Sequence, residues 1–154
     1  MSTVIRRAGI EDTAETAEVF IAARRAMASL PRLHTNAETS AFVLGFVERA
    51  ETWVAVHDGQ IAGLACLDGD WLEHLYVRPA SQNSGVGSAL LDHVKASRPG
   101  GFQLWTFRVN AGARRFYERH GCTLVRLTDG DRNEEQLPDA LYVWPEGKSV
   151  IDTD

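Results

Sequence analysis

The chain has 154 residues, of which 44% are hydrophobic and 24% charged, values typical of a single globular domain with a sizeable core. Its formal net charge of -5 argues against general nucleic-acid binding, which favours a basic surface. No apolar stretch has the length of a membrane span or a signal peptide, and two cysteines are too few for a disulfide framework. These features predict one cytoplasmic domain over residues 1–154 with no membrane partner.

The first third of the chain predicts a strand and two helices. Val4-Ile5 is typical of a short strand, and apolar residues at helical spacing predict a helix over Gly9–Met27. Leu30-Pro31 ends that helix, and the capping box Thr35-x-x-Glu38 predicts the start of a second one. Within the first helix, Arg24 and Arg25 are interpreted as solvated surface, with contact to a ligand as the alternative.

Three strands are predicted next. Trp53–Val56 and Ile61–Leu67 are apolar runs joined by Asp58-Gly59, a strong hairpin signal. Leu72–Val77 then mixes large apolar and aromatic residues without helical spacing. Such a meander suits an antiparallel sheet with helices packed on it.

The clearest local motif follows the third of these strands. Arg78-Pro79 ends the strand, Gln82–Gly87 is a loop, and Ser88–Leu91 begins an apolar helix. A helix N-terminus offers unpaired N–H groups to an anion, and Gly85 and Gly87 allow close backbone approach. No Lys-Ser/Thr follows, as a Walker loop requires, and the third glycine of the dinucleotide fingerprint is missing. On these residues alone, an ordinary tight turn is an equal alternative.

The rest of the chain predicts a strand parallel to Leu72–Val77, because a helix connects the two. A short helix containing Phe116 and Tyr117 ends at Gly121, a typical helix C-cap. Two more strands flank a polar, acidic loop, and the chain ends in a segment expected to be loosely held. The expected segments are a strand at Phe102–Phe107, a helix at Gly112–His120, strands at Cys122–Leu127 and Leu141–Trp144, the loop Asp129–Asp139 and the tail 146–154.

Two motifs carry a family resemblance. The first is Leu75-x-Val77-x-Pro79-x-x-Gln82-x-x-Gly85-x-Gly87, and the second is Asn110-x-x-Ala113-x-x-Phe116-Tyr117-Glu118-x-x-Gly121-Cys122. In this order they resemble the two cofactor segments of the GNAT superfamily of acyl-CoA-dependent N-acetyltransferases. The resemblance implies an α/β fold with a mixed, mostly antiparallel sheet, helices on both faces, and parallel strands four and five that splay apart.

The resemblance also implies how acetyl-CoA would bind. In the family, the pantetheine arm pairs with the backbone of strand four and the pyrophosphate meets amides of the glycine loop. An Asn after strand five helps to position the thioester end, although here that residue could simply end its strand. The matching residues in this chain are Leu75, Val77, Gln82, Asn83, Gly85, Gly87, Ser88 and Asn110. No metal is expected.

Tyr117 matches the tyrosine that the family commonly uses as general acid, with a packed aromatic as the alternative. Some relatives carry a base, a Glu, five residues before the Asn, where this chain has Trp105. An indole is no useful base, so Glu73 is predicted to replace it, directly or through water. Pleating should turn His74 to the opposite face unless a bulge intervenes, and Glu73 could instead only order the acceptor.

The predicted reaction is transfer of an acetyl group to a primary amine, by direct attack in a ternary complex. His34, Asn133 and Glu134 are tentative acceptor contacts, although an exposed histidine and a solvated acidic loop are open alternatives. The acceptor could be a small molecule or a peptide, and the family often forms homodimers. A non-catalytic acyl-CoA-binding module and a nucleotide-binding protein are the rival interpretations.

Overall fold

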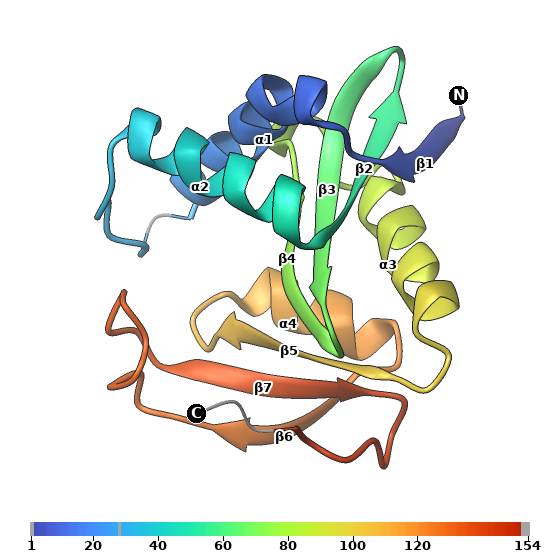
Figure 1. Ribbon diagram of the computed structural model, residues 1–154. Helices are drawn as coiled ribbons and strands as arrows, with labels where there is room; N and C mark the ends of the chain where they lie inside the picture. The colour runs from blue at the N-terminus through green and yellow to red at the C-terminus, as the bar shows by residue number, and fades with distance from the viewer. Residues whose placement is uncertain (1, 28, 152–154) are drawn as a thin grey trace.

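The computed structural model describes residues 2–27 and 29–151. Its core is one seven-stranded sheet in the order β1-β2-β3-β4-β5-β7-β6 (Figure 1). All neighbouring strands are antiparallel except β4 and β5, which are parallel, so the predicted fold class is confirmed. The strands are β1 Thr3–Arg7, β2 Glu51–His57, β3 Gln60–Asp68, β4 Trp71–Val77, β5 Phe102–Phe107, β6 Thr123–Leu127 and β7 Asp139–Trp144.

Helices cover both faces of the sheet. The short 3-10 helix η1 leads into α1, and α1 and α2 share a buried apolar layer with residues of β2 and β3. A second 3-10 helix, η2, precedes α3, and α3 and α4 pack into the core layer on the other face (Figure 1). The helices are η1 Ile10–Asp12, α1 Thr13–Arg25, α2 Asn36–Arg49, η2 Pro79–Ser81, α3 Val86–Ser97 and α4 Ala111–Arg119.

The capping box before α2 forms as the sequence predicts. The Thr35 side chain accepts a hydrogen bond of 3.1 Å from the Glu38 amide, and the Glu38 carboxylate accepts one of 2.8 Å from the Thr35 amide. The first helix is shorter than expected at its start, because Gly9 precedes the single turn η1 and α1 begins at Thr13.

Strands β4 and β5 separate soon after they meet. Their only pairing is between Trp71 and Gln103, reinforced by a 2.8 Å hydrogen bond from the Gln103 amide to the Asp70 carbonyl. Beyond this point no strand in the described part of the chain pairs with the β4 edge that faces β5. The splayed strands predicted from the resemblance are therefore present, and they open the centre of the sheet.

Strand β4 contains a bulge at Glu73. In its register with β3, His74 pairs with Cys66 and Leu72 pairs with Leu67, which leaves Glu73 as the extra residue. Leu72 and Leu75 consequently pack in the same core layer, although three positions separate them. Simple alternation of Glu73 and His74 is thus broken, as a bulge allows.

The segment after β7 makes specific contacts. Gln103, which is fully buried, accepts a 2.8 Å hydrogen bond from the Ile151 amide, and its side-chain nitrogen donates to the Ile151 carbonyl. Lys148 forms a 3.1 Å ion pair with Asp70. The predicted loose tail is therefore attached to the sheet as far as Ile151, and residues 152–154 lie outside the described part.

Neither a membrane-spanning helix nor a metal-binding cluster is found in residues 2–27 and 29–151. Within these ranges, no helix combines the length and apolar character that crossing a membrane requires. The same residues contain no group of three or more His, Cys, Asp or Glu side chains that could hold a metal ion.

Candidate active site

The main cleft lies where β4 and β5 separate. Its volume is about 860 Å³, within the range usual for small-molecule sites. Its wall is built from β4, the glycine loop, the start of α3, the end of β5, α4 and the end of α1. The lining includes every residue predicted to bind the cofactor, together with Tyr117: Leu75, Val77, Gln82, Asn83, Gly85, Gly87, Ser88 and Asn110. The fold thus brings together residues that lie up to 42 positions apart in the chain (Leu75 to Tyr117).

The glycine loop presents an open helix N-terminus. Asn83 and Gly85 both have positive φ angles, of 64° and 88°, and Gly85 is the N-cap of α3. Most helices begin with a side chain that accepts a hydrogen bond from the first turn, but Gly85 has none. The N–H groups of residues 86–88 are therefore free to bind an anion, and the helix dipole favours one there.

Gly87 also allows two helices to approach each other. A Cβ atom built at Gly87 would lie 3.4 Å from two ring carbons of Phe116 on α4. Ser88 and His120 share a hydrogen bond of 3.0 Å beside this contact. These two contacts hold the first turn of α3 against α4 at the cleft.

Asn110 has a structural role besides its predicted one. Its side-chain oxygen accepts a 3.1 Å hydrogen bond from the Ala113 amide and so caps α4. The same residue lines the cleft. Because that oxygen is engaged, its amide nitrogen is the group best placed to donate to a ligand.

Tyr117 is buried, with 7% of its surface exposed, yet it lines the cleft. Its ring packs against Phe116 at 5.3 Å and Tyr142 at 6.3 Å between centroids. Among the described residues, none forms a hydrogen bond with its hydroxyl. Burial, followed by the nearby Cys122 and Tyr76, raises the pKa of the Tyr117 phenol, which therefore stays protonated and able to donate.

Glu73 lies outside the lining of the cleft, at the bulge in β4. Its side chain reaches solvent, but surrounding protein still removes much of its hydration. This burial, and then the nearby Asp68 carboxylate, raise the pKa of Glu73 above its usual value. Trp105, at the position where some relatives carry a base, is 40% exposed and stacks on Trp71 at 6.4 Å.

His74 belongs to an aromatic cluster beneath α1 and α2. Its ring lies 5.3 Å from that of Phe20 and 4.9 Å from that of Phe46. Burial, followed by the charge of Arg24, lowers the pKa of His74 to about 4. The imidazole is therefore neutral near neutral pH.

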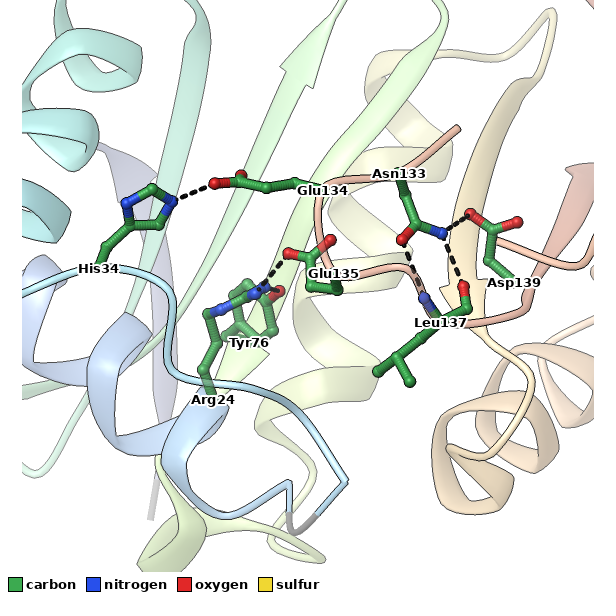
Figure 2. Close-up of polar contacts among 8 residues, drawn as sticks. All are labelled: Arg24, His34, Tyr76, Asn133, Glu134, Glu135, Leu137 and Asp139. Carbon is green, nitrogen blue, oxygen red and sulfur yellow. Dashed lines mark hydrogen bonds and ion pairs between the residues drawn. The ribbon is translucent and has the colours of Figure 1, made fainter. Parts of the chain in front are cut away.

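Two carboxylates of the β6–β7 loop reach across to the α1 side of the molecule (Figure 2). Glu134 contacts His34, and both side chains are mostly exposed, at 59% and 50%. Glu135 forms a 2.9 Å ion pair with Arg24, whose guanidinium also donates a 3.0 Å hydrogen bond to the Tyr76 hydroxyl. The interpretation of Arg24 as solvated surface is wrong: its side chain is 25% exposed, because the distant β6–β7 loop folds over it.

The Asn133 side chain is used within its own loop. Its nitrogen donates to the Leu137 carbonyl at 2.7 Å and to Asp139 at 3.1 Å, and its oxygen accepts from the Leu137 amide at 3.1 Å (Figure 2). These three bonds shape the loop and leave the amide little capacity for an acceptor. Asn133 is therefore suited to holding its loop in shape and not to contacting a substrate.

Several cleft residues were not identified from the sequence. They come from the end of α1 and the residues after it, from β4, from α4 and from the β6–β7 loop. Arg115 and Arg119 could have been found from the sequence, because a spacing of four on a predicted helix places them on the same face. The residues are Ala23, Ala26, Met27, Ser29, Leu30, Tyr76, Arg115, Arg119 and Leu137.

Comparison with known proteins agrees with this geometry. Residues 48–121 match the acetyltransferase (GNAT) domain family. The peptidyl-lysine N-acetyltransferase YiaC of Escherichia coli (strain K12) is 30% identical over 101 residues, which cover 65% of this chain and 67% of YiaC. The chain belongs to the GNAT acetyltransferase family. For this acetyltransferase, the rival interpretations as a non-catalytic acyl-CoA-binding module or a nucleotide-binding protein lose their support.

Solved structures show the same fold as this GNAT acetyltransferase. The solution structure of apo-form YjaB from Escherichia coli superposes with a TM-score of 0.78 at 23% identity, covering 94% of this chain and 98% of YjaB. The structure of yncA, a putative acetyltransferase from Salmonella typhimurium with its cofactor acetyl-CoA, has a TM-score of 0.71 at 20% identity, covering 99% of both chains. At these identities the likeness concerns the fold.

Proposed function

We propose that this protein transfers an acetyl group from acetyl-CoA to a primary amine, with the lysine side chain of a peptide as the favoured acceptor class. One observation carries the proposal. The cleft between β4 and β5 combines a helix N-terminus without a side-chain cap, an edge of β4 that no described strand pairs with, and the Tyr117 hydroxyl, which no described residue bonds. The similarity to YiaC, a peptidyl-lysine N-acetyltransferase, supports the choice of acceptor.

In the proposed reaction, the neutral amine attacks the thioester carbonyl. A C–N bond forms, the C–S bond breaks, and its electron pair goes to sulfur. Tyr117 donates a proton to the departing thiolate, while Glu73 takes a proton from the nitrogen directly or through water. Solvent then restores both side chains, and the products are the N-acetylated amine and CoA.

Direct attack in a ternary complex is favoured over an acyl-enzyme. An acyl carrier would need a reactive thiolate, and both cysteines are buried. Burial raises the pKa of Cys66 and of Cys122 to about 11, and neither residue lines the cleft. Catalysis would then rest mainly on placing the amine and thioester together.

The acceptor is proposed to enter beside the β6–β7 loop. Glu134 is exposed and contacts only the exposed His34 among the described residues, so an ammonium group could replace that contact at little cost. Glu135 is more buried and bound to Arg24, which suits a role in holding the loop. A homodimer, which the resemblance admits, stays a prediction.

The proposal is tested with a panel of amines that includes lysine peptides, polyamines, aminoglycosides and amino acids. Released CoA thiol is measured with acetyl-CoA as donor, and mass spectrometry locates the acetyl group. We expect turnover with lysine peptides above that with free amino acids blocked at the side chain. Acetylation confined to peptide N-termini or small amines would contradict the acceptor class, and no turnover with any amine would contradict the reaction.

Substitution of Gly87 should weaken CoA binding. In Gly87→Val, the added methyl groups would occupy the cleft beside Phe116 and obstruct approach to the first turn of α3. We expect affinity for CoA, measured by calorimetry, to fall at least tenfold, or about 1.4 kcal/mol.

Gly87→Ala provides the matched control for folding. Its single methyl group would meet Phe116 at 3.4 Å, an ordinary contact, so the helix pair should be retained. A folded Gly87→Val protein with unchanged CoA affinity would show that ligand does not approach the backbone here.

A further inference from the structure

Two arginines lie on one wall of the cleft without a described use. Arg115 and Arg119 are four residues apart on α4, so they project from the same face of the helix. Both are solvent-exposed and both line the cleft that contains Gly85 and Ser88. They place two positive charges at the cleft in a protein whose net charge is -5.

Neither arginine is neutralised by another residue of the described part of the chain. In residues 2–27 and 29–151, no carboxylate lies within ion-pair distance of Arg115 or Arg119. Arg119 lies over the Phe116 ring at 5.9 Å, which orients its guanidinium without satisfying its charge. Arg114 differs, because it donates a 3.0 Å hydrogen bond to the Tyr142 hydroxyl, which donates in turn to Glu118 at 2.5 Å.

Like charges spaced by four residues repel each other on a helix, so two arginines without a described partner do not help α4 itself. An anion in the cleft would remove this repulsion. Arginine is suited to such a ligand, because its planar fork can bind two phosphate oxygens at once.

The arginines lie close to the open N-terminus of α3. The contact of Phe116 with Gly87 and the hydrogen bond of Ser88 with His120 hold α4 beside the first turn of α3. His120 is a poor cation, since burial and then Lys95 lower its pKa. The site therefore has two separate groups of hydrogen-bond donors suited to binding an anion. They are the backbone amides of α3 and the guanidinium groups of α4.

CoA carries two separate anionic groups, a pyrophosphate and a terminal 3′-phosphate on its ribose. We propose that Arg115 and Arg119 bind the 3′-phosphate of CoA, while the amides of α3 hold the pyrophosphate. This inference rests on the proposed function. It assigns the exposed side-chain donors to the terminal phosphate and predicts that the protein distinguishes CoA from 3′-dephospho-CoA.

The test is calorimetric titration of the protein with CoA and with 3′-dephospho-CoA. The wild-type protein should bind CoA at least tenfold more tightly. Arg115→Gln/Arg119→Gln should lose this preference, with CoA affinity falling to that of 3′-dephospho-CoA and affinity for 3′-dephospho-CoA changing less than twofold. Each single variant should lose part of the preference.

Arg49→Gln is the charge control, because Arg49 is an exposed arginine at the end of α2, outside the cleft. It should keep the full preference for CoA, and thermal unfolding would confirm that all variants are folded. An equal loss of affinity for both ligands in the double variant, or no preference in the wild type, would overturn the assignment. Failure of the wild type to bind either ligand would instead refute the proposed function.

Discussion

Removing the hydroxyl of Tyr117 should lower kcat for acetyl transfer about 100-fold. Tyr117→Phe keeps the aromatic ring that packs against Phe116 and Tyr142, so the cleft should keep its shape. Affinity for CoA should therefore change little. The loss is expected because no other described residue bonds the hydroxyl, which leaves it available to protonate the departing thiolate.

Changing the acetyl donor shows whether Tyr117 acts as a general acid or only as a packing residue. An acetyl thioester with a more acidic leaving thiol needs less proton donation, so the effect of Tyr117→Phe should be smaller with such a donor. Steady-state kinetics with acetyl-CoA and the activated donor measure this difference. Near-wild-type rates with both donors would leave Tyr117 as a packing residue.

Tyr142→Phe is the matched control for Tyr117. Tyr142 is a second buried tyrosine in contact with Tyr117, but its hydroxyl is bonded to Arg114 and Glu118 and it does not line the cleft. Loss of the Tyr142 hydroxyl should lower the free energy of unfolding by about 1 kcal/mol, the usual contribution of a hydrogen bond. It should leave kcat within a few-fold of wild type.

Replacing Glu73 with Gln should lower turnover about 100-fold near neutral pH if the carboxylate is the base. A lysine amine with an ordinary pKa of about 10.4 is neutral in only about one molecule in 2,500 at pH 7, so removal of its proton matters most there. At high pH more of the amine is already neutral, and the difference between Glu73→Gln and wild type should shrink. A pH-independent loss would instead assign Glu73 to acceptor binding or orientation.

The raised pKa of Glu73 predicts how kcat/KM depends on pH. A base must be deprotonated, so kcat/KM should fall as the pH drops through the folded-state pKa of Glu73, above the ordinary glutamate value. Asp68→Asn removes the neighbouring negative charge that raises this pKa. It should move the acidic limb of the pH profile to lower pH, and an unmoved limb would exclude Glu73 as the titrating group.

Local patterns were enough to predict much of this protein. The strand–loop–helix around Gly85 and Gly87, the capping box at Thr35 and the hairpin at Asp58-Gly59 all form as expected. These features depend on backbone conformation and on contacts between residues a few positions apart, which the sequence displays directly. The connecting helix predicted that the fourth and fifth strands are parallel, and the family resemblance added that they splay apart, which local patterns do not specify.

The bulge at Glu73 is a feature that patterns in the sequence could not predict. Its position on a strand was predicted, but the bulge that breaks its alternation with His74 depends on the register between β3 and β4. Register is settled by which side chains pack on each face across the sheet, and both Leu72 and Leu75 enter the same core layer. A single strand read alone carries no information about its partner.

The sequence by itself indicated the fold class, the glycine loop that is predicted to bind an anion, and part of the cleft lining, including Leu75, Val77 and Tyr117. Only the tertiary structure decided which charges are used and which are free: Arg24 is paired with Glu135, 111 residues away, whereas Arg115 and Arg119 have no partner among the described residues. The physical reason is that turns and helix caps depend on residues a few positions apart, while burial, ion pairs and long-range hydrogen bonds depend on which distant segments the packed sheet brings together.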